Sequence, residues 1–229
     1  ATAPAESNIY HAAIGGSTNV QIWEVNYCGS VTINGGDVTA TGGDASSGIG
    51  GGPVSGGKIV INGGTVTATG GNNAAGIGGG MQGNGGSVTI NGGEVTATGG
   101  NQAAGIGSGT MGGRIQIQIN GGTVNATGGS QGAGIGDGME CSNDGSITIT
   151  GGTVTATGGY QGTGIGGGAK TPGGKITISG GTVTANGADG ASGIGHGGLG
   201  ATGGEITISG GTVTATGGSG NPGISCQDA

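Results

Sequence analysis

The sequence predicts an all-β protein that folds as a parallel, right-handed, three-sided β-helix of about seven coils. Two observations support this. A unit of 27 to 32 residues recurs seven times, beginning at Ser30, Lys58, Ser87, Gln116, Ser146, Lys175 and Glu205. Each unit contains three short segments in which apolar residues alternate with others, and glycines bound every segment. Repeats of this length are typical of stacked supersecondary units, none of which can bury its apolar side alone.

The unit that begins at Lys58 illustrates the three segments. Ile59 and Ile61 flank Val60 in the first, and Asn62-Gly63-Gly64 then favours a turn because Asn and Gly tolerate positive φ. The second segment, residues 65–69, reads Thr-Val-Thr-Ala-Thr, and its β-branched residues favour a strand. The third, residues 75–78, reads Ala-Gly-Ile-Gly. The coil length and the handedness of parallel β crossovers favour a right-handed helix.

Three apolar columns are expected to point inward. The first column contains Val38, Val66, Val95, Val124, Val154, Val183 and Val213. The second contains Ala40, Ala68, Ala97, Ala126, Ala156, Ala185 and Ala215, and the third contains Ile49, Ile77, Ile106, Ile135, Ile165, Ile194 and Ile224. A complete column of alanine brings two walls close together, so we expect a flat cross-section.

The first 29 residues do not follow the repeat. They hold Trp23, Tyr10 and Tyr27, and the triplet 13–15 (Ala-Ile-Gly) matches the third segment of a unit. We therefore divide the chain into an N-terminal cap with an incomplete coil, residues 1–29, and a β-helix repeat domain, residues 30–229. Solenoids need covered ends because unpaired strand edges promote aggregation.

The composition excludes several partners. The chain has four basic and eleven acidic residues, which gives a net charge of −7. Binding to nucleic acid or to anionic lipid requires a basic surface. No apolar run reaches the roughly 20 residues of a membrane span. The opening Ala-Thr-Ala-Pro is what we expect of a mature secreted protein whose signal peptide has been removed. We therefore expect an extracellular protein that binds neither nucleic acid nor membrane.

Catalytic and metal-binding groups are scattered, so we expect neither an enzyme nor a cofactor. His11 and His196 have no evident partners, and Lys175 and Glu205 on neighbouring coils suggest a simple ion pair. The acidic turn 137–144 offers oxygen ligands for Ca²⁺, but its spacing matches no calcium loop, and we interpret it as a solvated turn. The cysteines at 28, 141 and 226 would lie three coils apart, or ~14 Å at ~4.8 Å per coil. That exceeds the roughly 7 Å Cα limit of a disulfide, so free thiols are expected.

An array of outward threonines is the main candidate site. If valine and alanine of the second segment point inward, the flanking residues form three outward columns. Seventeen of these 21 positions are threonine: Thr39, Thr41, Thr65, Thr67, Thr69, Thr96, Thr98, Thr123, Thr127, Thr153, Thr155, Thr157, Thr182, Thr184, Thr212, Thr214 and Thr216. The exceptions are Asp37, Glu94, Asn125 and Asn186. Threonine is also an ordinary outward strand residue, so the array can equally be an inherited feature of the repeat.

Two resemblances follow from these residues. Phrases such as Gly-Gly-Thr-Val-Thr-Ala-Thr-Gly-Gly and Ala-Gly-Ile-Gly-Gly-Gly resemble glycine-rich repeats of bacterial cell-surface and secreted proteins along the whole chain. The threonine array alone is similar to the Thr-x-Thr faces of β-solenoid antifreeze proteins. The second resemblance implies that the 17 threonines bind ice, with the four exceptions weakening the first column and the two ends.

The sequence thus predicts an ice-binding protein whose partner is the ice surface. The alternative is a bacterial cell-surface adhesin or carbohydrate-binding module, whose partner would be a polysaccharide or a host surface. A passive spacer is a third interpretation. The glycines that alternate with isoleucine in the third segment, such as Gly76 and Gly78, suggest in addition a face without side chains on which the terminal segment or a second copy of the chain could dock. The alternative is that these glycines only permit tight coils.

Overall fold

The computed structural model of the protein describes residues 29–83, 86–142 and 145–226, together with the backbone of three pairs of residues further upstream, 10–11, 14–15 and 17–18. Trp23, Tyr27, Cys28 and the end of the acidic turn at 143–144 lie outside the described residues. The division of the chain at residue 29 therefore stays a prediction.

The described chain forms three parallel sheets, which confirms the predicted β-solenoid. The first sheet contains β4 (Ser30–Ile33), β7 (Lys58–Ile61), β10 (Ser87–Ile90), β13 (Gln116–Ile119), β16 (Ser146–Ile149), β19 (Gly174–Ile178) and β22 (Gly204–Ile208). The second contains β5 (Asp37–Thr41), β8 (Thr65–Thr69), β11 (Glu94–Thr98), β14 (Thr123–Thr127), β17 (Thr153–Thr157), β20 (Thr182–Asn186) and β23 (Thr212–Thr216). The third contains β2 (Ile14–Gly15), β6 (Ile49–Gly50), β9 (Ile77–Gly78), β12 (Ile106–Gly107), β15 (Ile135–Gly136), β18 (Ile165–Gly166), β21 (Ile194–Gly195) and β24 (Ile224–Ser225).

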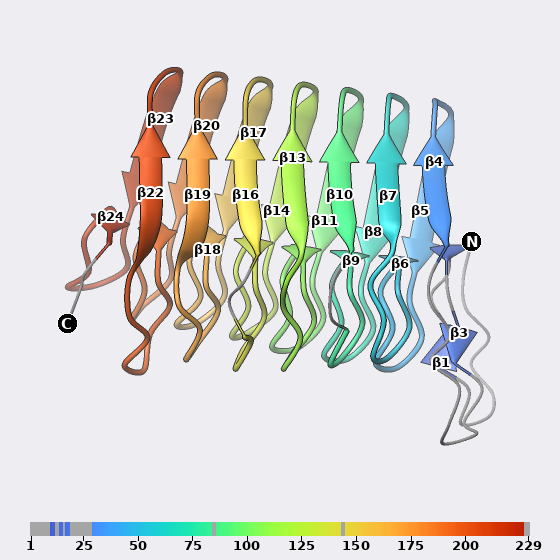
Figure 1. The fold of residues 1–229 in the computed structure, drawn as a ribbon, viewed down its shortest axis with the longest axis horizontal. Coiled ribbons are helices and arrows are strands. Elements are labelled where there is room, and N and C mark those ends of the chain that lie inside the picture. Colours follow the sequence, from blue (N-terminus) through green and yellow to red (C-terminus); the bar gives the residue numbers. More distant parts are fainter. Residues whose placement is uncertain are drawn as a thin grey trace.

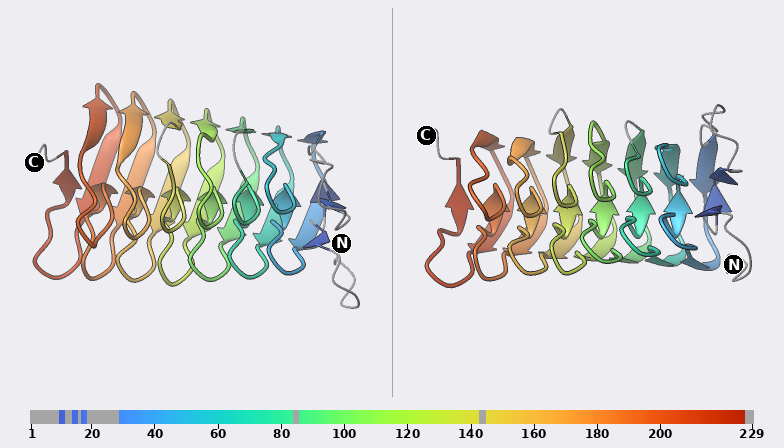
Figure 2. Two further views of the ribbon diagram at one scale, coloured as in Figure 1. Left: turned by 60° about the horizontal axis from the view of Figure 1, so that its bottom comes forward. Right: turned by 90° about the horizontal axis from the view of Figure 1, so that it is seen from below.

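The chain follows a right-handed course (Figure 1). In that view each strand of the first sheet rises in front, a tight turn crosses at the top, and a strand of the second sheet descends behind. In the middle coils, loops extend below the sheets before and after the short third strand (Figures 1 and 2). At the N-terminal end β1 (Tyr10–His11) pairs antiparallel with β3 (Ser17–Thr18), while β2 extends the third sheet through Ile14 and Ile49.

The top turn is held by a ladder of asparagines. The second glycine of each turn has a positive φ, as at Gly64 with 90°, which is a conformation that glycine adopts at no steric cost. Just before it, the side-chain amides of Asn62, Asn91 and Asn120 each donate to the asparagine of the preceding coil over 2.7 to 2.8 Å. Thr150 continues the ladder by donating its hydroxyl to Asn120 Oδ1 at 2.9 Å.

The core is a single stack of aliphatic side chains. The predicted valine, alanine and isoleucine columns are buried through the middle coils, and the isoleucines of the first sheet, such as Ile61 and Ile90, fill the remaining space. The stack loosens at its C-terminal end, where Ile208 is 41% and Ile224 43% exposed.

The expectation of an open glycine face was wrong. The glycines of the third strand are buried in every coil from β6 to β21. A Cβ on Gly76 would lie 2.7 Å from the carbonyl oxygen of Thr98 and 2.8 Å from that of Gly105, both in the next coil. The close backbone approach that glycine permits is therefore used between successive coils. The glycines of the third sheet are therefore not an open docking surface, and the tight-coil interpretation agrees with their burial.

We predict that Ile106→Ala lowers the free energy of unfolding by about 2–5 kcal/mol, because a fully buried side chain is lost and a cavity remains. Urea denaturation followed by circular dichroism measures the loss. Ile224→Ala is the matched control in the same column, and its effect should be less than half as large because its side chain is 43% exposed. Equal losses in the two variants would contradict the stacked core.

Candidate functional site: the threonine array

The array lies on the outer side of the second sheet. Burial alternates along each strand as predicted: in β11, for example, Val95 and Ala97 are buried while Glu94, Thr96 and Thr98 are exposed. Every one of the 17 predicted threonines is exposed or half-buried. The outward placement follows from the period-2 geometry of a strand whose valine and alanine face the core.

The strands pair in register without a bulge, so the threonines form straight columns. Thr96 lies between Thr67 and Asn125, and Thr98 between Thr69 and Thr127. In the second half of the stack Thr155 pairs with Thr184, which pairs with Thr214. Neighbours are ~4.8 Å apart between strands and ~6.8 Å apart along a strand. The resulting surface is roughly 17 Å by 30 Å on the same spacings.

The departures from threonine are not confined to the edges. Asn125 lies in β14, the middle strand of the sheet, and separates Thr96 from Thr155 in the second column. The third column runs without interruption from Thr41 to Thr157 over five coils. Asp37 and Glu94 both belong to the first column, nearest the top turn. The largest block of threonines therefore lies toward the C-terminal half, where β17 is complete.

The hydroxyls of the array are available to solvent. Apart from Thr39, the array threonines make no side-chain hydrogen bond to any described part of the protein. A β-branched side chain also has restricted χ1 freedom. Apart from Thr39, the array is thus a set of ordered hydroxyl and methyl groups whose remaining partner is water.

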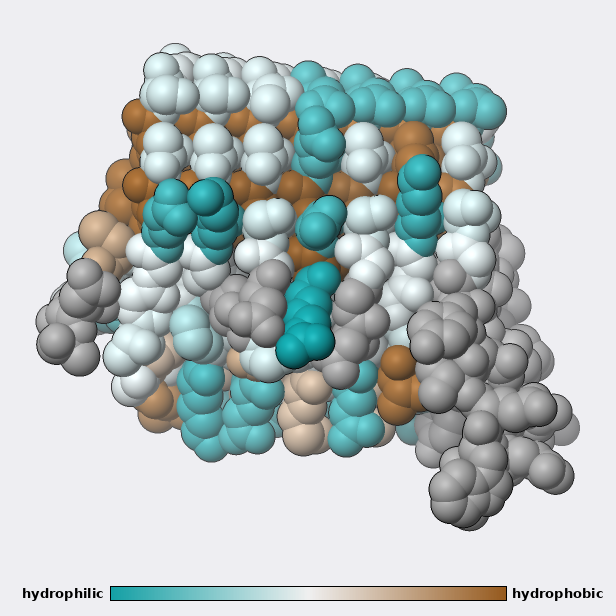
Figure 3. Space-filling view, in the orientation of Figure 1, coloured by the Kyte–Doolittle hydropathy of each residue, from teal (hydrophilic) through white to brown (hydrophobic). Residues whose placement is uncertain are grey.

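The first sheet presents a different surface. Figure 3 shows its outer side, where hydrophilic side chains interrupt the rows of intermediate hydropathy. Lys58, Gln118 and Lys175 are among its outward residues. The predicted ion pair is confirmed here, with Lys175 Nζ 3.2 Å from Glu205 Oε2 and both side chains more than half exposed, and such a pair contributes little to stability.

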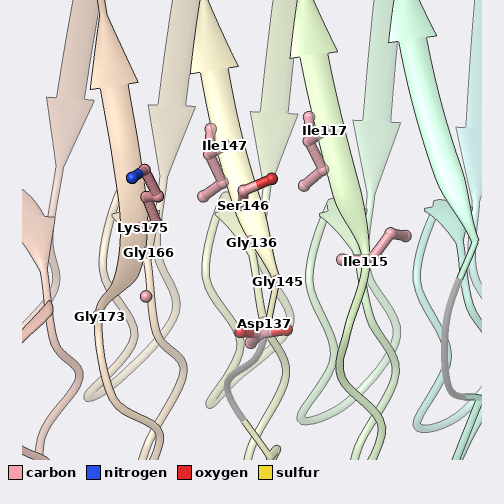
Figure 4. A pocket seen from close by; sticks show the side chains of 11 residues that line it. Ile115, Ile117, Gly136, Asp137, Gly145, Ser146, Ile147, Gly166, Gly173 and Lys175 are labelled. Carbon is pink, nitrogen blue, oxygen red and sulfur yellow. The ribbon is translucent and has the colours of Figure 1, made fainter. Parts of the chain in front are cut away.

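A second polar cluster lies inside the loops. Ser108 donates its hydroxyl to Asp137 Oδ1 at 2.7 Å, and its oxygen lies 3.3 Å from the sulfur of Cys141. All three residues are buried. Asp137 helps to line a small pocket together with Ile117, Ile147 and Lys175, and Figure 4 shows how these side chains lie on successive coils. Asp137 is therefore not part of a solvated turn, which corrects the sequence-based interpretation.

Burial dominates the acid–base properties of this cluster. It raises the pKa of Asp137 from 3.8 to about 6, and the hydrogen bond from Ser108 opposes the rise. Burial, assisted by the nearby carboxylate, raises the pKa of Cys141 to about 12, so the thiol stays protonated at neutral pH and is a poor nucleophile. Cys141 and Cys226 are both free thiols, as expected. The described residues contain no group of three or more His, Cys, Asp or Glu that could hold a metal ion, and they include no helix that is long and apolar enough to span a membrane.

The expectation that His196 lacks partners was also wrong. Its Nε2 lies 2.6 Å from the hydroxyl of Ser225, and its Nδ1 lies 3.0 Å from the carbonyl oxygen of Gly197. Ser225 stands where the other coils have glycine in the third strand. Ser108, Asp137 and His196 likewise share one position of the unit, which is glycine in three other coils, at 51, 79 and 167. This replacement of glycine by polar residues was the signal in the sequence that could have identified both contacts.

Comparison with known proteins supports the architecture. A family model for the beta helix repeat matches seven segments of the chain: residues 31–53, 59–81, 88–110, 117–139, 147–169, 176–195 and 206–226. Each segment begins in a strand of the first sheet and includes the second and third strands of its coil. Searches of curated proteins and of solved structures returned no match.

We predict that Asp137→Asn makes the protein more stable at pH 7 but not at pH 3. The pKa of the carboxyl is higher in the folded protein than its ordinary 3.8, so ionisation destabilises the fold as pH rises from about 4 to about 6. The penalty above that range is about 3 kcal/mol. Denaturant titrations of both proteins between pH 3 and pH 8 measure it.

Ser108→Ala serves as the control, because it should increase the pH-dependent loss of stability that Asp137→Asn removes. Without the hydroxyl that donates to the ionised carboxylate, the pKa of Asp137 in the folded protein should rise further. The fall in stability should still begin near pH 4, but it should extend to higher pH and become larger. A variant Asp137→Asn whose stability has the same pH profile as the parent protein would show that Asp137 is not the group responsible.

Proposed function

The chain belongs to the beta helix repeat family, and on this scaffold we propose that the threonine array binds ice and that the protein acts as a secreted antifreeze protein. The observation that carries the proposal is the in-register pairing of the seven strands of the second sheet. A motif repeated in sequence becomes a two-dimensional lattice only when successive coils pair without offset.

The chemistry of the lattice suits an ice surface. Ice presents a regular array of uncharged oxygens, so a complementary surface should be regular, rigid and mildly polar. Threonine supplies one hydroxyl and one methyl group, and the limited χ1 freedom of its side chain means that little rotamer entropy is lost on adsorption. Water held between the methyl groups and anchored by the hydroxyls can take ice-like positions. The ~4.8 Å and ~6.8 Å repeats are close to oxygen spacings in ice.

The distribution of charge supports the same proposal. The array has 21 outward positions, of which two are acidic and none is basic. The four basic residues of the chain, Lys58, Arg114, Lys170 and Lys175, all lie outside it. Charged side chains hold hydration water strongly, so their near absence favours contact with a frozen surface.

Carbohydrate binding or adhesion is the second candidate, and the array favours it less. Sugar sites usually combine aromatic side chains with convergent hydrogen-bonding groups. In the repeat region of the sequence Tyr160 is the sole aromatic residue. It is 59% exposed on the loop that follows β17, and it is not one of the 21 positions of the array.

We predict that Thr155→Tyr reduces thermal hysteresis by about tenfold or more. All three outward residues of β17 are threonine, and a bulky ring at the middle one would keep the neighbouring threonines from contacting ice. The melting temperature should stay nearly unchanged, since Thr155 is half-buried on the outer side of the sheet. Thr148→Tyr is the matched control: Thr148 is the half-buried outward threonine of β16, the first-sheet strand of the same coil.

The two variants and the parent protein are compared by thermal hysteresis and by the shape of ice crystals, beside an acidic control protein of similar size. A freezing gap that Thr155→Tyr removes and Thr148→Tyr retains supports the array as the ice-binding site. Equal activity of the two variants would locate the site elsewhere. No freezing gap in the parent protein would overturn the proposal, and a glycan array would then test the second candidate.

A further inference from the structure

A row of exposed side chains runs along the base of the solenoid, on the loop that follows each third strand. We call it the base ridge. It contains one residue from each of six successive coils: Val54, Gln82, Met111, Glu140, Lys170 and Leu199. All six are exposed, and all six have a left-handed backbone, with φ between 55° and 62°.

This conformation makes the presence of side chains notable. Glycine adopts it freely, and asparagine and aspartate tolerate it best among the other residues. The chain has 70 glycines, yet none of the six positions is Gly, Asn or Asp. One is Val54, whose β-branched side chain is among the least tolerant of positive φ. Side chains are thus retained here against a local conformational cost.

The ridge is ordered by backbone hydrogen bonds. The amide of each of its first five residues donates to a carbonyl oxygen of the next coil, as from Val54 to Met81 at 3.0 Å and from Met111 to Met139 at 2.9 Å. The same bond links Gln82 to Thr110, Glu140 to Ala169 and Lys170 to Gly198. The ridge side chains therefore follow one another at about the spacing of the coils, ~4.8 Å.

Apolar surface collects on these loops. Val54 is 44%, Met111 45% and Leu199 54% exposed, and Tyr160 lies on the neighbouring loop. These are four of the six large hydrophobic residues that are exposed in the described chain. Between the fourth and fifth residues of the ridge there is an ion pair, with Lys170 Nζ 2.7 Å from Glu140 Oε1. The lower edge of Figure 3 shows hydrophobic and hydrophilic side chains succeeding one another along the base.

We propose that the base ridge is the contact surface of a homodimer, in which a second copy of the chain docks base to base and antiparallel. A twofold axis between Glu140 and Lys170 reverses the order of the coils. It sets Glu140 against Lys170 of the second copy, and Lys170 against its Glu140. One coil further out on each side, Met111 faces Leu199 of the second copy.

Charge and hydropathy are both self-complementary in this arrangement. At the centre of the interface Glu140 and Lys170 of one copy meet Lys170 and Glu140 of the other. On either side of these four charges, Met111 of one copy packs against Leu199 of the other. On the neighbouring loops the same axis sets Ser130 against Tyr160 and Asn101 against Asp189, without like charges in contact. In this arrangement the described coils of the second copy place no residue opposite Val54. Both threonine arrays stay exposed, because the base and the second sheet are different sides of the solenoid (Figure 2).

Sedimentation over a range of concentrations tests the proposal. The parent protein should dimerise reversibly, and Leu199→Asp and Met111→Asp should each raise the dimer dissociation constant by about tenfold or more. Val54→Asp is the matched control: it makes the same substitution at a residue of similar exposure and similar φ, and it should leave the dissociation constant unchanged. A monomer at every concentration, or equal weakening by Val54→Asp, would overturn the proposal.

Cysteine cross-linking tests the pairing directly. In a Cys28→Ser, Cys226→Ser background, Met111→Cys with Leu199→Cys should give a disulfide-linked dimer on mild oxidation, while either cysteine alone should not. The two positions are three coils or ~14 Å apart within one chain, too far for an internal disulfide. Cross-linking by the single variants as efficiently as by the double variant would contradict the antiparallel register.

Discussion

The in-register hydrogen bonding of each coil to the next is the constraint on which the rest of the structure depends. Parallel pairs such as Thr96↔Thr67 and Ile106↔Ile77 place each residue over its counterpart one unit away. A stack of this kind tolerates little offset, because a shift of one residue would turn a whole strand inside out. Glycine satisfies the constraint in the third sheet: a Cβ on Gly107 would collide with the carbonyl of Gly136.

Stacking converts each position of the unit into a column, and every column then has one physical role. Apolar columns fill the core, asparagines form a hydrogen-bonded ladder at the top turn, and threonines form the array on the second sheet. The ladder and the array differ in one respect that matters for function. The asparagine amides bond to one another, whereas the array hydroxyls, Thr39 apart, have solvent as their remaining partner.

Polar residues inside the loops do not follow this regularity. Asp137 and Ser108 occupy a position that is glycine in other coils, and they bond across one coil boundary at 2.7 Å. Their burial makes part of the stability pH-dependent. The base ridge is irregular in another way, since its backbone is the same in six coils while its side chains differ in every one. Regular columns suit a crystalline ligand, and a varied row suits one specific partner.

The sequence by itself determined the sheets, the inward columns and the outward placement of the array, because periods of two and of about 29 residues dictate which side chains share a face. Tertiary structure decided what the two loops do, because loop residues have no periodic pattern that indicates burial. It brought Ser225 to His196 and Ser108 to Asp137, and it closed the third sheet from solvent. The pairing of strands in the second sheet also places Asn125 in the middle strand of the array. The order of the strands turns a list of threonines into a surface.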